Sequence, residues 1–407
     1  MMIVIFCIGI ITGCGKEENE TTTTSEVTIP ELKEEAKNIK NFKNIDFTNT
    51  VFKLPDTNSI SELTFDLEKE GKSPEETFDY LYNKFTNAIY IYTGKKPEDK
   101  NIYFKLPRDD DVINIKNVTN EDLKKSEPQS YFLSYNDGKN SLLLYGSSYM
   151  CEMADEMVSS KYKSTVDWVG FRPEDTTLAK SYDLEKDDIS NEVYKVNGED
   201  VSIQEAVSFV ENELKKTLPF LSSEFLTYKV FRVEVYRLAD DDYYYKMSVR
   251  ALYDGISFQY ENNAVCFPAD KKADYNDFSE NTTVTLMEKD KINYFWSCSH
   301  TYDNIKVGKT YDKFISLRKA CSLLSDKISK YQEMNCESVE LMYRTAFRFK
   351  EVPDVIDDEK VQSKVTTSIW CYPVYCFKFT KTHLPEYPVL YFLVDAINGE
   401  VQSSKPN

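Results

Sequence analysis

Histidine and glycine are both rare in this chain, which narrows the chemistry available to it. Only 2 of the 407 residues are histidine and only 12 are glycine. Histidine is the side chain most often used as a general base at neutral pH, so few candidates exist for that role. The sequence also lacks the glycine-rich loops that hold nucleotide phosphates, the G-x-S-x-G turn and the H-E-x-x-H pair. We therefore expect a protein that is not an enzyme and needs no cofactor or metal.

Positive charge is in short supply as well. Lysine and arginine number 50 against 68 aspartate and glutamate residues, which gives a formal net charge of −18. The phosphates of nucleic acid would be repelled, and no basic cluster offsets this charge. Nucleic acid is therefore excluded as a partner. The abundant residues are instead aromatic, with 29 tyrosines and 24 phenylalanines, and this bias favours β-strands.

The chain opens with an apolar stretch from Ile3 to Ile11. It is far shorter than the ~20 residues of a membrane-spanning helix but has the length of a signal-peptide core. The stretch ends in Ile11-Thr12-Gly13-Cys14, which resembles the lipobox of bacterial lipoproteins. That resemblance implies cleavage between Gly13 and Cys14 and attachment of a diacylglycerol to Cys14. Two acyl chains, at ~0.8 kcal/mol per buried methylene, hold a protein firmly to a membrane. We predict a palmitate-type anchor on the outer face of the cell membrane.

Two features surround this motif. No Lys or Arg precedes the apolar stretch, as a signal peptide requires, so we expect the true start codon to lie a few residues upstream of Met1. After the motif, residues 15–25 are polar and include four consecutive threonines. Such a segment cannot bury enough apolar surface to fold, and it predicts a tether.

The number and spacing of the cysteines do not indicate a disulfide pairing. Of nine cysteines, Cys7 leaves with the signal peptide and Cys14 carries the lipid, so an odd number, seven, remains. No C-x-x-C zinc spacing occurs. Cys371 and Cys376 on one unbroken strand would lie about 16 Å apart, whereas a disulfide needs Cα atoms within roughly 4.4–6.8 Å. They pair only if Pro373 turns the chain sharply, so most of these thiols are expected to be buried apolar side chains.

Three helices are predicted from capping and periodicity. Ser73-Pro74-Glu75-Glu76 supplies an N-cap, a first-turn proline and a capping-box glutamate, and apolar residues follow at helical spacing. Ser202-Ile203-Gln204-Glu205 begins a second helix in the same way. A third helix is predicted over residues 314–331.

Strands with period-two alternation follow the second and third helices. They are predicted over 231–237, 243–252 and 255–260, and again over 339–350, 369–379 and 389–401, with an earlier hairpin turning at Asn136-Asp137-Gly138. Because a helix followed by about three strands occurs twice, we predict an α+β fold of repeated units, each one helix packed on an antiparallel β-sheet.

The predicted organisation has five parts. Residues 1–13 form the signal peptide, and 14–45 form the lipidated cysteine with a disordered tether. Residues 46–190 form an N-terminal α+β domain, and 191–300 and 301–407 form the two helix-plus-sheet units.

Two further resemblances concern the body of the chain. Residues 391–401, with Val394-Asp395-Ala396 and Asn398-Gly399 in sequence, look like the last hairpin of a PepSY-type domain, which implies a helix with antiparallel strands. The whole layout resembles uncharacterised lipoproteins of the Firmicutes, a family that implies no activity. Asp395 itself is expected to be a turn residue that accepts hydrogen bonds from its own backbone.

Few residues suggest catalysis. Cys298 and His300 are two apart, which on a strand places them on one face, as a thiol–imidazole pair would require. No orienting acid lies nearby in sequence, so an inert histidine is the favoured interpretation, as it is for His383 in a proline-marked loop. The acidic runs Asp109–Asp111 and Asp240–Asp242 lack the spacing of a calcium loop and are interpreted as solvated turns.

The aromatic residues of "YIYTGKKP" and "DDDYYYKM" could instead stack on sugars or peptide. We therefore expect a membrane-anchored, non-catalytic binding module of a Gram-positive envelope, with an envelope protein, peptide or glycan as its partner. One alternative is a solute-binding lipoprotein of a transporter, which needs two lobes of alternating β and α segments. Another is an envelope hydrolase, which needs a deep pocket with paired carboxylates or a Cys298–His300–acid triad.

Overall fold

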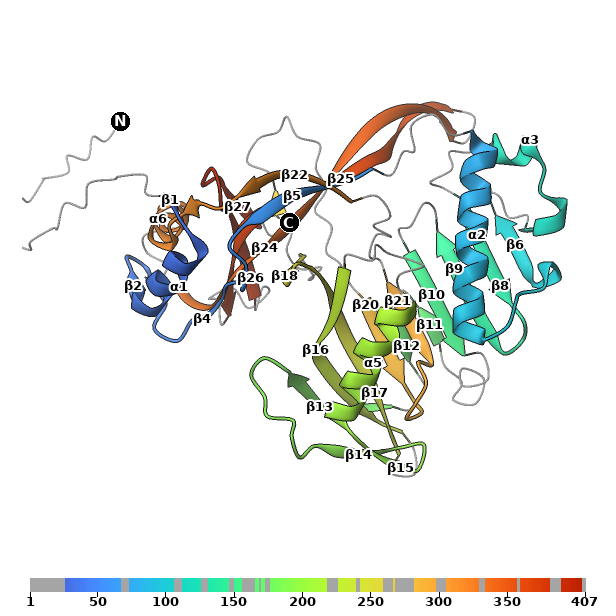
Figure 1. Cartoon of the computed structure of the whole chain (residues 1–407), viewed down its shortest axis with the longest axis horizontal. Helices are drawn as coiled ribbons and strands as arrows, with labels where there is room; N and C mark the ends of the chain where they lie inside the picture. Colours follow the sequence, from blue (N-terminus) through green and yellow to red (C-terminus); the bar gives the residue numbers. More distant parts are fainter. Residues whose placement is uncertain are drawn as a thin grey trace, which may run out of the picture.

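The structure is a computed structural model of the whole chain (Figure 1). It describes residues 26–66, 73–105, 112–125, 131–145, 150–155, 165–167, 170–172, 176–217, 226–238, 242–258, 266–267, 282–297, 305–328, 334–356, 359–380 and 389–404.

The described part of the chain is mostly β and contains two large sheets, one of eleven strands and one of ten. Neighbouring strands are antiparallel throughout, apart from β24, which runs parallel to the short strands β3 and β4. The predicted fold class of repeated units, each one helix on its own sheet, is therefore wrong. The strands assigned to separate units join into shared sheets instead.

The eleven-stranded sheet, called here the first sheet, is built from the middle of the chain. Its strands in spatial order are β13 (Thr177–Asp183), β16 (Leu226–Arg237), β17 (Tyr243–Tyr253), β20 (Thr282–Leu286), β21 (Tyr294–Ser297), β10 (Met150–Asp155), β9 (Asn140–Tyr145), β8 (Phe132–Asn136), β6 (Ile102–Lys105) and β7 (Val112–Asn114), with β18 (Ile256–Ser257) beside β17. Helices α2 (Pro74–Thr93) and α5 (Ile203–Thr217) bury their apolar stripes in a common core with these strands.

The ten-stranded sheet, called here the second sheet, combines strands from both ends of the chain. In spatial order they are β19 (Cys266–Phe267), β27 (Val401–Ser404), β26 (Val389–Asp395), β25 (Glu359–Thr380), β24 (Met334–Ile356), β3 (Ile45–Asp46) and β2 (Asn41–Phe42), with β4 (Val51–Lys53), β5 (Ile60–Asp66) and β22 (Ile305–Tyr311) joined to them off this path. Helices α1 (Ile29–Asn38) and α6 (Leu317–Lys327) pack on its core.

The remaining elements are short. They are the strand pairs β1 (Glu26–Val27) with β23 (Phe314–Ile315), β11 (Thr165–Asp167) with β12 (Gly170–Arg172) and β14 (Val193–Val196) with β15 (Glu199–Ser202), helix α3 (Asn120–Leu123), and the 3₁₀ turns η1 (Asp99–Asn101) and η2 (Ile115–Asn117).

The chain enters the second sheet first, leaves it to form the first sheet, and returns to complete the second. Strands β3, β4 and β5 pair with β24, β25 and β22, which lie more than 200 residues later, and β2 joins the sheet beside β3. The predicted units 46–190, 191–300 and 301–407 therefore do not coincide with the sheets. The physical reason is that β24 and β25 each have two long edges, and strands from the N-terminal segment satisfy the backbone groups on those edges.

The predicted tether extends too far along the chain. Residues 26–45 are folded, because β1, α1, β2 and β3 lie within them. Ile29 and Leu32 of α1 are buried in the core of the second sheet, and Thr28 closes a capping box with Glu31. An apolar pair at helical spacing thus ties α1 to the sheet, and the tether prediction holds no further than residue 25. Residues 1–25 lie outside the described part.

The local signals in the sequence were read correctly at several helix and hairpin boundaries. Ser73 accepts a hydrogen bond from the backbone N–H of Glu76 at 3.1 Å, and Glu76 accepts one from the N–H of Ser73. Ser202 and Glu205 form the same reciprocal pair at the start of α5. The hairpin predicted around residue 138 is the β8–β9 turn. These predictions depend only on neighbouring residues, which is why they were confirmed.

The turn between β26 and β27 offers a test of how tightly the second sheet packs on α6. Gly399 has a φ of +79°, and a Cβ atom there would lie 2.7 Å from Cδ1 of Leu323 in α6. Gly138 has a similar φ of +81° but no atom within 4 Å of that position. We expect Gly399→Ala to lower the free energy of unfolding by about 2–3 kcal/mol and Gly138→Ala by about 1 kcal/mol, since both strain the backbone but only the former meets a side chain. Urea unfolding of the two variants checks this, and equal losses would contradict it.

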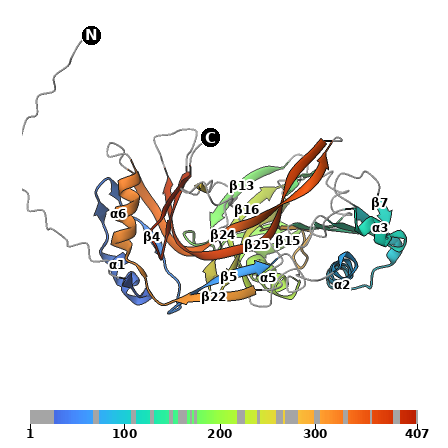
Figure 2. The same cartoon turned by 90° about the horizontal axis from the view of Figure 1, so that it is seen from above.

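Strands β24 and β25 are much longer than the rest of the second sheet. They pair with each other from Cys336–Phe379 to Ile356–Glu359, whereas β5 joins β25 only at residues 368–371 and β26 only at residues 374–380. Residues 359–367 of β25 lie outside these pairings, and there β24 and β25 continue as a two-stranded ribbon, which arches away from the second sheet (Figures 1 and 2). Pro353 lies within the ribbon, and proline is tolerated only at a strand position that donates no ladder hydrogen bond.

The first sheet reaches into the core of the second through one hairpin. Strand β17 turns at Asp254 and Gly255, both with positive φ, into β18. Ile256 and Phe258, just after this turn, are buried in the core of the second sheet, and Phe258 forms a bridge with Tyr343 of β24. The ring centroids of Phe258 and Tyr343 are 5.2 Å apart. This aromatic contact provides an apolar connection between the two sheets.

Candidate functional site

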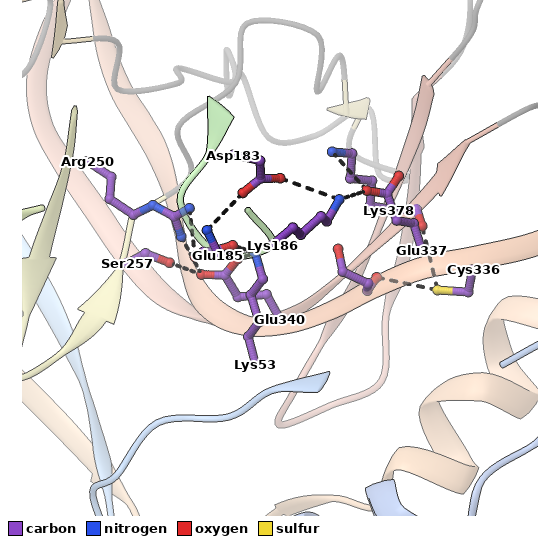
Figure 3. Close-up of polar contacts among 11 residues, drawn as sticks. Lys53, Asp183, Glu185, Lys186, Arg250, Ser257, Cys336, Glu337, Glu340 and Lys378 are labelled. Atoms are coloured by element: carbon purple, nitrogen blue, oxygen red, sulfur yellow. Dashed lines mark hydrogen bonds and ion pairs between the residues drawn. The ribbon is translucent and has the colours of Figure 1, made fainter. Parts of the chain in front are cut away.

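Charged side chains gather where the two sheets meet, and two of them, Arg250 and Glu340, are buried (Figure 3). We call this cluster the charged junction. It consists of side chains from the first sheet and the turn after β13, which meet side chains from β4, β24 and β25 of the second sheet. Its members are Lys53, Asp183, Glu185, Lys186, Arg250, Ser257, Glu337, Glu340 and Lys378.

Arg250 is at the centre of one half of the charged junction. It comes from β17 and is only 5% exposed. Its Nη2 lies 3.0 Å from Oε1 of Glu185, and its Nη1 lies 3.4 Å from Oε1 of Glu340. The guanidinium also lies over the ring of Phe231, 4.7 Å from its centroid. A planar cation between two carboxylates and an aromatic face is a stable arrangement for a buried arginine.

Glu340 receives further support from both sheets. The hydroxyl of Ser257 in β18 donates a hydrogen bond to its Oε1, and Nζ of Lys53 lies 3.9 Å from its Oε2. Lys53 also pairs with Glu185. A buried carboxylate is tolerated only when its oxygens have such partners, because desolvation otherwise costs several kcal/mol.

Lys186 organises the other half of the charged junction. It pairs with Glu337 of β24 and lies 3.4 Å from Oδ2 of Asp183. Lys378 of β25 lies 3.8 Å from the same Glu337. In Figure 3 the side chain of Lys186 points from the turn after β13 toward the second sheet.

The turn that carries Glu185 and Lys186 is stabilised by its own aspartates. Oδ1 of Asp183 accepts a hydrogen bond from the N–H of Glu185 at 3.1 Å, and Oδ2 of Asp187 accepts one from the N–H of Asp183 at 2.8 Å. The N–H groups of Lys186 and Asp187 donate to the carbonyl of Asp183. Side-chain oxygens that bind nearby N–H groups are what allow Asp-rich segments to turn tightly.

The pKa shifts at this turn favour the ionised state on both sides. Burial would raise the pKa of Asp183, but the hydrogen bond from Glu185 and the charge of Lys186 outweigh it and lower that pKa. The hydrogen bond to Glu337 raises the pKa of Lys186. Asp183 thus contributes stability that is lost as the pH falls through its lowered pKa, and Lys186 contributes stability that is lost as the pH rises through its raised pKa. Both contributions are present throughout the neutral range.

The space inside the charged junction is small. A cavity of about 30 Å³ there is lined by members of the junction together with Val51, Phe231, Arg232 and Ser338. Ligand pockets usually measure about 300–1,000 Å³, whereas a single water needs roughly 10–15 Å³. Lys53, Lys186, Arg250 and Lys378 each form an ion pair with a carboxylate of the junction. The geometry therefore suits the joining of two sheets rather than the binding of a sugar or peptide, and the carboxylates do not line a pocket of the depth that a hydrolase needs.

Most of the residues that the sequence marked as candidate sites lie outside the described part of the chain. They are Gly13, Cys14, Asp109, Asp110, Asp111, Asp240, Asp241, Cys298, His300 and His383. Within the described ranges, no group of three His, Cys, Asp or Glu side chains is arranged to hold a metal ion.

Two predicted turn aspartates are described. Asp395 is 7% exposed, and its Oδ1 accepts hydrogen bonds from the N–H groups of Ile397 at 2.8 Å and Asn398 at 3.0 Å. Burial raises the pKa of Asp395, and these hydrogen bonds oppose the shift. Asp395 is thus the turn residue that was predicted. Asp242 also lies in a turn, where its Oδ1 accepts from the N–H of Gly198 at 3.3 Å.

Four cysteines of the described ranges are free thiols, namely Cys321, Cys336, Cys371 and Cys376. Strand β25 runs without interruption through Pro373, so the two cysteines on either side of it remain too far apart to pair, as the strand geometry predicted. Burial raises the pKa of the Cys321 thiol to about 12.

The aromatic residues proposed for stacking on sugars or peptide are mostly part of the core. Tyr244 and Tyr245 are buried, and Tyr92 and Tyr243 pack against the core of the first sheet. Tyr90 is 56% exposed on α2 and is the member of these runs that presents a large surface to solvent.

The charged junction was not identified from the sequence, although two of its residues carried a signal. Arg250 stands between Val249 and Ala251 in β17, and Glu340 stands between Val339 and Leu341 in β24. A charged residue inside a strand that is apolar on both faces needs a buried partner. What no local pattern could supply is the identity of that partner.

Comparison with known proteins gives no functional assignment. No family model matches the chain, and no curated protein matches it. A crystal structure of an uncharacterized protein from Eubacterium rectale is similar, with 12% sequence identity and a TM-score of 0.47, over 89% of this chain and 91% of that one. Among the described residues, no helix is both long and apolar enough to cross a membrane.

Proposed function

We propose that this chain is a lipoprotein held on the outer face of the cell membrane through Cys14, with a folded body that acts as a binding module of the envelope. The observation that carries the anchor is the Ile11-Thr12-Gly13-Cys14 sequence at the end of a short apolar stretch. Its partner is an envelope protein, peptide or glycan, and nucleic acid is excluded by the charge of −18.

The position of the first folded elements supports this proposal. Helix α1 lies with α6 at one end of the long axis of the molecule, and α2 and α3 lie at the other end (Figure 1). Only eleven residues lie between Cys14 and Glu26, so the anchor limits the α1 end to about 40 Å from the membrane at full extension. If the α1 end of the body is held near the membrane, the opposite end, which contains part of the first sheet, faces the surroundings.

The arrangement of strands does not suit the solute-binding alternative. That class is built from two lobes in which parallel strands alternate with helices. In both large sheets described here, neighbouring strands are antiparallel except where β3 and β4 pair with β24, and the N-terminal strands belong to the sheet completed by the C-terminal ones. We therefore place the binding role ahead of transport.

Replacement of Cys14 tests the anchor directly. Cells that produce the native chain and are fed radiolabelled palmitate should yield a labelled protein in the membrane fraction, whereas Cys14→Ala should abolish the label and release the protein. Cys376→Ala, at a half-buried thiol in β25, is the matched control and should keep the label. Equal labelling of the native and Cys14→Ala chains would contradict the proposal.

A further inference from the structure

Strand β22 forms an outer edge of the second sheet and is unusually exposed. It pairs with β5 from Ile305–Phe65 to Tyr311–Ile60, and no described strand lies on its other side. The five residues from Lys306 to Thr310 are all exposed, so neither face of the strand is covered there. In Figure 2 β22 lies beside β5 at the border of the molecule. Its outer N–H and C=O groups form an open edge of the kind that accepts another strand.

A row of apolar side chains that runs across neighbouring strands of the second sheet ends at β22 with an exposed residue. Val307 pairs with Leu63 of β5, and Leu63 pairs with Cys371 of β25. Leu63 and Cys371 are completely buried, whereas Val307 is 56% exposed. One more strand beside β22 would cover Val307 and continue the row.

The strand is held in place despite its exposure. The hydroxyl of Tyr311 donates to Oε1 of Glu62 at 2.5 Å, and the hydroxyls of Ser61 and Thr310 lie 2.7 Å apart. The register shifts between Val307 and Thr310, which marks a bulge at Gly308. An edge held by its neighbour before a partner arrives loses less entropy on binding.

The charges of β22 decide which strand can join it. Lys306 and Lys309 are exposed in a chain whose net charge is −18, and Nζ of Lys309 lies over the ring of Tyr311, 4.5 Å from its centroid. Pairing of two β22 strands from two copies would bring four lysines together, and like charges on neighbouring strands are destabilising. A strand with glutamate or aspartate opposite the lysines would be stabilised instead.

We propose that β22 is a docking edge for an extended, acidic segment of a partner protein, which adds to the second sheet as an extra strand and covers Val307. This inference deepens the proposed binding role and rests on it, but it is independent of the lipid on Cys14. The two lysines would repel the β22 strand of a second copy and attract an acidic strand.

The test uses the full chain and a fluorescein-labelled peptide of alternating glutamate and valine, (Glu-Val)4. Fluorescence anisotropy should show saturable binding, and hydrogen exchange should show new protection at residues 305–311. The same peptide N-methylated at every residue keeps its charge but has no N–H to donate to β22, and it should not bind.

Charge reversal gives the matched variants. Lys306→Glu with Lys309→Glu should weaken (Glu-Val)4 binding at least tenfold, since two favourable pairs become unfavourable ones. Lys139→Glu with Lys195→Glu changes the net charge equally at exposed positions away from β22 and should leave binding unchanged. The proposal is overturned if (Glu-Val)4 fails to bind at millimolar concentration, if the N-methylated peptide binds equally, or if both double variants behave alike. Palmitate labelling is unaffected by any of these outcomes, so failure of the docking edge is distinguishable from failure of the anchor.

Discussion

Replacement of Arg250 by methionine should lower the free energy of unfolding by about 3–5 kcal/mol. The change leaves the carboxylates of Glu185 and Glu340 without the cation that lies between them, and Glu340 is 9% exposed. A buried charge without its partner retains the full cost of its desolvation. Urea denaturation followed by circular dichroism measures the loss.

Two further variants separate this cause from a general effect of losing a charge. Lys180→Met breaks a contact of 2.8 Å with Glu192 in which Lys180 is 51% exposed, and it should cost less than about 1 kcal/mol. Adding Glu340→Met to Arg250→Met should recover part of the loss, because one stranded carboxylate is removed. A double variant less stable than Arg250→Met alone would show that desolvation of Glu340 is not the cause.

Truncation of Phe258 should have an effect of similar size through a different mechanism. Phe258 is completely buried in the core of the second sheet although it follows β18 of the first. Phe258→Ala should cost about 3–5 kcal/mol, because it removes a large side chain and leaves a cavity. It also removes the aromatic contact with Tyr343, so we expect the two sheets to lose their cooperative unfolding.

Tryptophan fluorescence can report on each sheet separately. Trp296 belongs to β21 of the first sheet and Trp370 to β25 of the second, while Trp168 lies outside the described residues. With Trp168 changed to phenylalanine, chains that keep one of the other two tryptophans should give coincident urea transitions. Adding Phe258→Ala should separate those transitions. Coincident transitions in the variant would refute the view that Phe258 couples the sheets.

The features that were predicted correctly from the sequence are local ones. Helix α2 begins at its capping serine, α5 begins after Ser202, and the β8–β9 and β26–β27 turns occur at the Asp-Gly and Asn-Gly signals. Each of these depends on interactions between residues within about four positions of one another, so the chain encodes them directly.

The sheets could not be predicted in this way because their strands come from distant parts of the chain. Strand β4 has three residues and lies parallel to β24, and nothing in Val51, Phe52 or Lys53 indicates that partner. The helices at 203–217 and 317–327 appeared to begin two equal units. They pack instead on sheets that also contain strands from outside those units.

The charged junction was partly visible in the sequence. Arg250 and Glu340 could be recognised as charges inside apolar strands, but Lys53 and Glu185 lie in segments where exposed charges are usual. Their roles come from the meeting of four chain segments, which only the tertiary structure defines. The open edge at β22 was hidden for the same reason, since an edge exists only once the neighbouring strands are known.

The split construction of the second sheet sets an order of assembly as the chain is made. All strands of the first sheet are present once residue 297 has emerged, whereas β2 to β5 must wait for β24 and β25, the last of which ends at Thr380. Until then Leu63 and Phe65 of β5 lack the partners that bury them. The N-terminal segment of a nascent chain therefore keeps apolar residues unburied through most of synthesis. A chain that ends before residue 334 would lack β24 and β25 and could not form the second sheet.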